Sequence, residues 1–142
     1  MKVTKTASAQ WKGGLKDGKG TITTESGALS EQPYGFNTRF EGVRGTNPEE
    51  LLGAAHAGCF TMALSLMLGD AGFKADQLDT TAKVTLEQVG GGFEITAVHL
   101  TLKGQVPGMD AAAFQAVADK AKAGCPLSKV IRAPITLDAS LG

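Results

Sequence analysis

The chain has 142 residues, of which 42% are apolar and 19 are glycine, and its 14 basic residues balance its 14 acidic ones. Length and composition are typical of a single globular domain, expected here over residues 1–142, with enough chain to bury a core. The zero net charge argues against a nucleic-acid binder, which needs a basic surface. With only two cysteines, a disulfide-rich scaffold and a four-cysteine zinc site are excluded.

The N-terminal segment MKVTKTASAQWKGG contains no apolar core of the kind found in a secretory signal. A cytoplasmic protein is therefore expected. In that compartment a disulfide is usually transient and catalytic rather than structural, so the role of the two cysteines is the main question that composition leaves open.

The first part of the chain has strand and loop patterns. Residues 3–11 and 20–24 are rich in threonine and valine and predict two strands, joined by the turn-prone stretch KGGLKDG. Residues 25–38 carry Gly, Ser, Pro and Asn and predict mostly a loop. A short extended piece is expected around residues 37–41.

A long helix is the strongest local prediction. Asn47 suits the N-cap, Pro48 the first helical position and Glu50 the carboxylate of a capping box. The apolar run continues for about 22 residues to a stop near Gly69. Residues 51–68 are uncharged and reach the lower limit for a membrane span. Acidic flanks without a basic or aromatic belt argue against a membrane, so we expect the helix to be buried in a core.

Two further strands follow. Apolar and polar residues alternate over 78–88, and a triple glycine then leads into a second strand over 93–103. In this second strand the apolar phase switches, which predicts either a bulge near Ala97 or burial on both faces.

The C-terminal third predicts a second helix that begins after Asp110 and ends before Pro126. Its apolar stripe runs towards Cys125. Residues 126–131 predict a helical turn and residues 134–139 a final strand. Strands, a buried helix, a hairpin and another helix together predict an α+β domain.

The two cysteines occupy different settings. Cys59 lies in the middle of the long helix and Cys125 at the end of the second helix, so each alone is interpreted as a core residue. If the two helices pack, the sulfurs come within disulfide range, which makes the pair a candidate for redox chemistry. A reactive thiolate needs a nearby cation. The arginines that precede the long helix closely are Arg39 and Arg44.

Glu49 has a capping role at the start of the long helix. It precedes Cys59 by ten residues, roughly 15 Å along a helix, so a role near that thiol requires a second, antiparallel copy of the helix and a subunit interface. His56 lies one turn before Cys59, and a Cys–His pair is conceivable, but a core histidine is the favoured interpretation. Two histidines and two cysteines without close spacing are a poor metal signature, so neither a metal nor a cofactor is expected.

The segments QPYGFNTRFEG, GTNPEELLGAAHAGCFTMALSLML and KAKAGCPLSKV resemble the OsmC/Ohr family of osmotically inducible and organic hydroperoxide resistance proteins. The resemblance runs almost end to end. It implies an OsmC-like α+β fold, with antiparallel sheets wrapped around a long buried central helix that carries Cys59, in an intertwined homodimer. It also implies a thiol-dependent peroxidase that prefers organic hydroperoxides and protects against oxidative stress.

The resemblance further implies a role for each site residue. Cys59 corresponds to the peroxidatic cysteine and Cys125 to the resolving one, while Arg39 and Glu49 of the partner subunit activate Cys59. Glu49 is preferred to its neighbour Glu50 because its offset from the cysteine matches the family pattern. The implied partners are an organic hydroperoxide, an external thiol reductant and a second copy of the chain, with neither nucleic acid nor membrane.

Two alternatives stay open at this point. One is a non-catalytic binder of an apolar ligand at the dimer interface, with both cysteines in the core and unreactive. The other is a redox sensor, which a basic helix face or a partner-binding patch would favour; the sequence contains neither. For the peroxidase, an apolar pocket would favour alkyl hydroperoxides, and its expected lining is Phe36, Phe60, Met62 and Met67.

Overall fold

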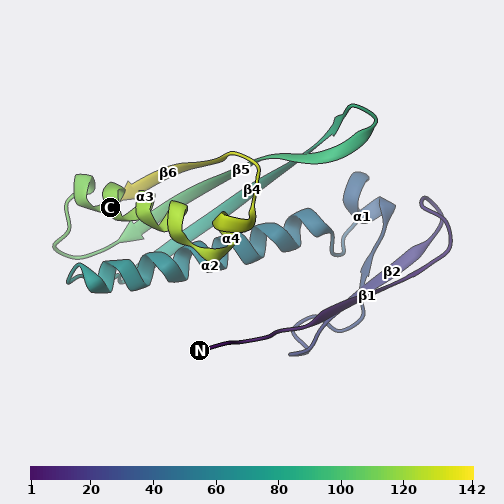
Figure 1. The fold of residues 1–142 in the computed structure, drawn as a ribbon, viewed down its shortest axis with the longest axis horizontal. Coiled ribbons are helices and arrows are strands. Elements are labelled where there is room, and N and C mark those ends of the chain that lie inside the picture. The colour runs from purple at the N-terminus through teal and green to yellow at the C-terminus, as the bar shows by residue number, and fades with distance from the viewer. The chain divides into compact units, whose positions relative to one another are not determined.

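The structure is a computed structural model that describes residues 1–142. By its internal contacts the chain divides into two compact units, Met1–Leu51 (unit 1) and Leu52–Gly142 (unit 2). The boundary lies near the start of the long helix α2 (Pro48–Asp70), and each unit has its own sheet (Figure 1). The single domain expected from the sequence stays a prediction.

Unit 1 contains an antiparallel sheet of β1 (Ala7–Lys12), β2 (Lys19–Thr24) and β3 (Gln32–Tyr34) in that order. The predicted hairpin between β1 and β2 is confirmed, although β1 begins at residue 7 rather than residue 3. Its turn depends on Gly13, which has a φ of 97°. A side chain there would also meet the Gly18 backbone at 2.9 Å, so glycine fits both the dihedral angle and the space.

A short helix, α1 (Phe36–Phe40), lies where the sequence predicted an extended piece, and that prediction was wrong. The hydroxyl of Thr38 accepts a hydrogen bond from the Gly35 N–H at 2.9 Å and donates one to the Gly35 carbonyl at 3.0 Å. These local bonds favour one helical turn in a segment too short to show a 3.6-residue period. Strand β3 also lies inside the predicted loop; it contains Pro33, which an edge strand tolerates.

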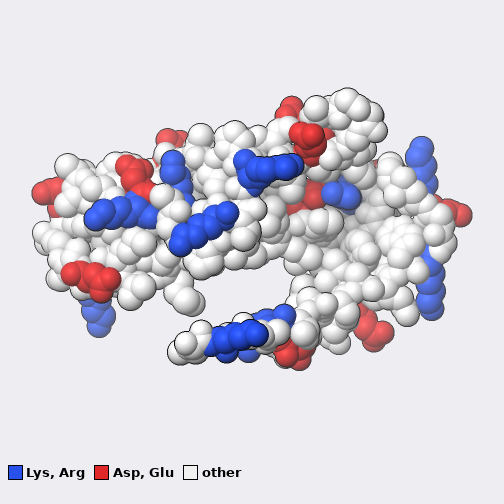
Figure 2. Space-filling view, viewed as in Figure 1, with Lys and Arg blue, Asp and Glu red and all other residues white.

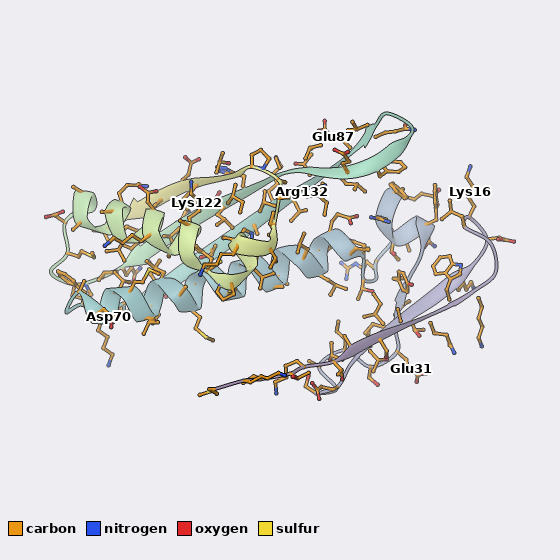
Figure 3. All side chains as sticks on the ribbon, viewed as in Figure 1. Lys16, Glu31, Asp70, Glu87, Lys122 and Arg132 are labelled. Atoms are coloured by element: carbon orange, nitrogen blue, oxygen red, sulfur yellow. The ribbon has the colours of Figure 1, made fainter.

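Helix α2 begins as predicted. The Asn47 side-chain oxygen accepts a hydrogen bond from the Glu50 N–H at 2.8 Å, and its amide donates to the Glu50 carboxylate. This is a capping arrangement that satisfies the otherwise unpaired N–H groups of the first turn. The helix ends at Asp70 (Figure 3), and Gly72 follows with a φ of 87°. A left-handed glycine just beyond the last turn is a common helix stop.

One face of α2 is buried and the other is exposed. Met62 and Leu66 on the outer face are 77% and 66% exposed. The helix was expected to be buried, but a single chain buries only one of its faces. By length and composition alone α2 is apolar enough to cross a membrane, a test that core helices of soluble proteins also pass. The buried residues recur every three or four positions: Gly53, His56, Phe60, Leu64 and Leu68.

The sheet of unit 2 has the order β4 (Gln77–Val89), β5 (Gly92–Gln105) and β6 (Ile135–Leu141). Strands β4 and β5 are antiparallel, and their register shifts at Thr85, which pairs with Ala97. This irregularity confirms the bulge that the apolar phase switch predicted.

Strand β6 runs parallel to β5, so the sheet is mixed rather than antiparallel throughout. A parallel neighbour needs a long crossover connection. Helices α3 (Ala111–Gly124) and α4 (Pro126–Val130) supply it. The side chain of Lys122 on α3 (Figure 3) donates a hydrogen bond to the Ile135 carbonyl at 3.4 Å, close to the start of β6.

The core of unit 2 lies between one face of the sheet and the helices. Alternate β5 residues are fully buried, and α2 and α3 contribute the opposing side chains, so both helices pack on the same face of β5. Lysines, arginines and acidic side chains are interspersed on the surface of this unit drawn in Figure 2. The α+β class is confirmed. The central core residues are Phe60, Leu64, Leu68, Val98, Leu100, Leu102, Phe114, Ala118 and Ala121.

Candidate thiol site

The two cysteines come from different helices of unit 2, and both are free thiols. Cys59 is half-buried on α2 and packs against the core. Cys125 is fully buried and ends α3 while serving as the N-cap of α4. Pro126 cannot continue α3 but suits the first position of the next helix, which explains why the chain turns at this cysteine.

The packing of the helices brings the two thiols together. The side chain of Cys59 lies beside that of Cys125, close enough for the two thiols to influence each other, and the backbone N–H of Leu127 on α4 also lies near the Cys59 sulfur. The condition that the sequence left open, namely that the two helices pack, is therefore met in unit 2.

The surroundings of Cys59 favour its protonated form. Burial raises the pKa of this thiol above its ordinary value, and the neighbouring Cys125 thiol raises it further, while the Leu127 N–H acts in the opposite direction. A thiolate nucleophile at neutral pH therefore requires an additional positive charge beside Cys59.

A chain of buried polar groups lies behind Cys125. The Ser128 N–H donates to the Cys125 sulfur at 3.3 Å, and the Ser128 hydroxyl lies 3.0 Å from the same sulfur. That hydroxyl is also 2.8 Å from Nε2 of His56. The other ring nitrogen of His56, Nδ1, is buried without a hydrogen-bond partner. His56 is therefore buried, as the core-histidine interpretation predicted. Only one of its two ring nitrogens has a hydrogen-bond partner.

Burial also lowers the pKa of His56, so the neutral imidazole prevails at neutral pH. Ser128, the partner of this histidine, was not predicted from the sequence. No sequence spacing indicates the contact, because the two residues are 72 positions apart and meet only through the packing of α2 against α4.

In unit 1, Arg39 and Glu49 form a bidentate ion pair. The guanidinium Nε donates to one carboxylate oxygen of Glu49 at 2.7 Å, and Nη2 donates to the other at 2.9 Å. Two parallel charge-assisted bonds fix the plane of the guanidinium. The Arg39 guanidinium also lies 5.6 Å from the centre of the Phe40 ring. Glu50 bonds to Asn47 instead, so the two adjacent glutamates have separate partners.

A mostly apolar hollow of about 180 Å³ lies beside this ion pair within unit 1. The Trp11 indole N–H donates to the Gly13 carbonyl at 3.0 Å, and its ring centre lies 5.4 Å from that of Tyr34, so the wall of the hollow is held in place. The hollow is lined by Trp11, Leu15, Tyr34, Gly35, Phe36, Arg39, Phe40 and Pro48.

Of the four residues expected to line an apolar pocket, Phe36 lines this hollow. The expectation for Phe60 was wrong, because its side chain is fully buried in the core of unit 2. Met67 packs against that core, while Met62 is exposed on α2. Because the α2 sequence is apolar on every face, it has no amphipathic stripe that would distinguish core residues from pocket residues.

Two free thiols in contact at a helix junction define a dithiol site, which can cycle between reduced and disulfide forms. The model of the family described as OsmC-like protein matches residues 40–140 of this chain. The chain therefore belongs to the OsmC-like protein family.

Individual relatives agree with this assignment. The chain is 60% identical over 141 residues to Peroxiredoxin OsmC of Escherichia coli (strain K12), with 99% of each chain covered. It is 36% identical over 101 residues to the Organic hydroperoxide resistance protein of Xanthomonas axonopodis pv. citri (strain 306), covering 70% of this chain and 69% of the relative. The solved structure of the Organic Hydroperoxide Resistance Protein OhrB of Bacillus subtilis superposes with a TM-score of 0.69 at 28% identity, covering 96% and 98% of the two chains.

Proposed function

We propose that this chain is a thiol-dependent peroxidase that reduces organic hydroperoxides to alcohols. The observation that carries the proposal is the contact between the free thiols of Cys59 and Cys125 in the interior of unit 2. Relatives named peroxiredoxin and organic hydroperoxide resistance protein support this activity and this class of substrate.

In the first step Cys59 acts as the nucleophile, because it is the more accessible of the two thiols. Its thiolate attacks the outer oxygen of the hydroperoxide, and the O–O bond breaks. The electron pair of that bond leaves on the inner oxygen, which takes up a proton and departs as the alcohol. Cys59 is left as a sulfenic acid.

In the second step Cys125 resolves this intermediate. Its sulfur attacks the sulfenic sulfur, a disulfide forms and hydroxide leaves as water. An external thiol then reduces the disulfide by two exchange steps, so each hydroperoxide consumes two thiols. The thiols are free in the reduced protein, which fits the reducing cytoplasm that we propose as its location.

Arg39 supplies the positive charge that Cys59 needs, and Glu49 holds its guanidinium in place. We propose that the pair comes from the partner subunit of a homodimer. Glu49 and Cys59 are ten residues apart on one helix, a separation of roughly 15 Å that rules out direct contact within that helix. The exposed Met62 and Leu66 on α2 support a second copy of the chain as the occupant of this face.

A non-catalytic binder of apolar molecules is the second candidate. It is favoured by the apolar hollow in unit 1 and by the raised pKa of the Cys59 thiol. In that case both thiols stay unreactive towards an alkylating agent at neutral pH. In a peroxidase, in contrast, Cys59 is alkylated at a pH well below the ordinary pKa of cysteine.

The test of the peroxidase uses cumene hydroperoxide with dithiothreitol as the reductant. Cys59→Ser should abolish hydroperoxide consumption, because no thiolate is left to attack. Cys125→Ser, treated with excess hydroperoxide without dithiothreitol, should complete a single turnover and then accumulate over-oxidised Cys59. Peptide mass spectrometry of the wild-type chain after one equivalent of peroxide should detect the Cys59–Cys125 disulfide. Full activity of the Cys59→Ser chain contradicts the mechanism.

A further inference from the structure

His56, Ser128 and Cys125 form a chain of polar side chains that is buried in the interior of unit 2. His56 and Cys125 are fully buried, and Ser128 is 9% exposed. The contacts run without a gap from His56 Nε2 to the Ser128 hydroxyl at 2.8 Å and from that hydroxyl to the Cys125 sulfur at 3.0 Å. An imidazole, a hydroxyl and a thiol in series resemble the way hydrolases activate a nucleophile through a hydrogen-bonded base.

Neither His56 nor Ser128 bonds covalently to a sulfur in the attack on the hydroperoxide, in the formation of the disulfide or in its reduction. Burying an imidazole with one nitrogen unpaired is unfavourable. An apolar side chain of similar size would avoid that cost, so a function for the histidine needs to be sought. Its only hydrogen-bonded neighbour, Ser128, touches the sulfur that reacts in the second step of the cycle.

We propose that Ser128 and His56 form a buried proton relay that activates Cys125 for its attack on the sulfenic acid of Cys59. The inference rests on the proposed peroxidase function and deepens its second step. Ser128 touches the reacting sulfur, and His56 acts through Ser128 as a positioning residue.

The relay moves one proton and is restored at the end of the step. The Cys125 S–H donates to the Ser128 oxygen, and the Ser128 O–H donates to His56 Nε2. As the Cys125 sulfur attacks the Cys59 sulfur, its proton passes through Ser128 to the imidazole. The S–O bond of the sulfenic acid breaks, and the oxygen leaves with the electron pair as hydroxide, which takes a proton from solvent and becomes water. His56 then gives up its proton, because burial disfavours the charged imidazole. The net products are one disulfide, one water and neutral His56.

The hydrogen bonds at Ser128 fit both states of the sulfur. Once Cys125 has lost its proton, the backbone N–H and the side-chain hydroxyl of Ser128 can both donate to the anionic sulfur. Burial keeps His56 in the neutral form that accepts a proton, since it lowers the pKa of the imidazole. The same two donors stabilise Cys125 as the leaving thiolate when an external thiol attacks Cys59 of the disulfide.

The experiment follows both steps of a single turnover. Reduced chain is mixed rapidly with cumene hydroperoxide, alcohol formation is measured for the first step, and disulfide formation is measured by quenched-flow mass spectrometry for the second. We expect Ser128→Ala to slow disulfide formation about tenfold and to leave alcohol formation unchanged. The lifetime of the sulfenic acid, measured by dimedone labelling of Cys59, lengthens by the same factor. Ser128→Thr keeps the hydroxyl and restores the rate.

The control variants match the chemistry but lie outside the relay. His99→Gln alters a second histidine that bonds to a hydroxyl, that of Thr136, on the exposed side of the sheet. Thr61→Val removes a hydroxyl that bonds to Thr80 within the same unit. Both should form the disulfide at the wild-type rate, whereas His56→Gln should be slow like Ser128→Ala.

Three results would overturn the relay: an unchanged disulfide rate in Ser128→Ala, equal slowing of both steps in that variant, or equal slowing in Thr61→Val. If His56→Gln does not fold, the comparison of Ser128→Ala with Ser128→Thr decides alone. If the wild-type chain consumes no hydroperoxide, the peroxidase proposal itself fails. If the wild-type chain carries out both steps and Ser128→Ala forms the disulfide at the wild-type rate, only the relay fails.

Discussion

At Cys59 several local influences oppose one another. Burial and the Cys125 thiol favour the protonated sulfur, while the backbone N–H of Leu127 favours the thiolate. A peroxidatic cysteine works as the thiolate, so the balance has to be shifted by a cation. Arg39 is suited to this role because its two hydrogen bonds to Glu49 hold the guanidinium in one orientation.

We predict that Arg39→Ala raises the pKa of Cys59 in the assembled protein. Thiolate formation is the pH-dependent step of alkylation, so the reaction is slow below this pKa and reaches its plateau above it. Loss of the cation should move the midpoint upwards by on the order of one pH unit, and the rate at neutral pH falls about tenfold. The measurement is the rate of iodoacetamide labelling of Cys59 between about pH 5 and pH 10.

Arg44→Ala is the matched control, because it removes an arginine from the same segment that forms no ion pair with Glu49. Its midpoint should equal that of the wild-type chain. If Arg39→Ala also leaves the midpoint in place, Arg39 does not activate the thiol.

Much of the candidate site could be predicted from the sequence, since motif resemblance identified Cys59, Cys125, Arg39 and Glu49 as candidates. The contact between His56 and Ser128 could not. A single histidine in an apolar helix has no periodicity, and its partner lies 72 positions later on a five-residue helix. The contact forms only when α2 packs against α4, so the local sequence around either residue does not predict it.

Among the elements, β5 shows most clearly how one position can control packing. Gly104 lies where β5 meets α3, and a Cβ atom there would come within 2.5 Å and 2.8 Å of two ring carbons of Phe114. It would also lie 3.3 Å from the Leu78 side chain. The ring is fully enclosed by the core, so it cannot move aside freely.

We therefore predict that Gly104→Ala lowers the free energy of unfolding by about 1–3 kcal/mol, the usual cost of overpacking a core. Gly92→Ala in the same strand is the control, since a Cβ atom at Gly92 has no heavy atom within 4 Å. Its effect should stay within about 0.5 kcal/mol. Urea denaturation followed by far-UV circular dichroism measures both values, and equal stabilities of the two variants would contradict the close contact.

Elements with explicit start and stop residues were predicted well. Asn47 and Asp110 both cap helices in the structure, and the phase switch near Ala97 indicated the bulge. Helix α1 and strand β3 were missed because they have five and three residues, fewer than a periodic pattern needs. The parallel direction of β6 was also missed, since alternation in a strand is the same for either direction.

At the scale of the whole molecule, the four candidate catalytic residues divide into two pairs. Arg39 and Glu49 belong to unit 1, and Cys59 and Cys125 belong to unit 2. In the proposed homodimer each active site combines the thiols of one subunit with the ion pair of the other. Activity then depends on assembly of the dimer.

Mixing an inactive and a strongly impaired variant tests this arrangement. We predict that Cys59→Ser and Arg39→Ala chains, unfolded and refolded together at equal amounts, recover about a quarter of wild-type peroxidase activity. Half of the dimers are then mixed, and each mixed dimer has one site with both Cys59 and Arg39. Each variant refolded alone is the control: Cys59→Ser has no activity and Arg39→Ala keeps about a tenth. If Arg39 acts within its own chain, the mixture does not exceed Arg39→Ala alone.

The hollow in unit 1 also has an optical consequence. Trp11 is the only tryptophan of the chain, and it forms part of the wall beside Arg39. Its indole emission therefore reports on the surroundings of this wall. An apolar molecule that enters the hollow displaces water from the indole, and the emission maximum shifts to shorter wavelength. Titration of the Cys59→Ser chain with cumene hydroperoxide, followed by this emission, thus tests whether a hydroperoxide enters the hollow, without turnover and without an added label.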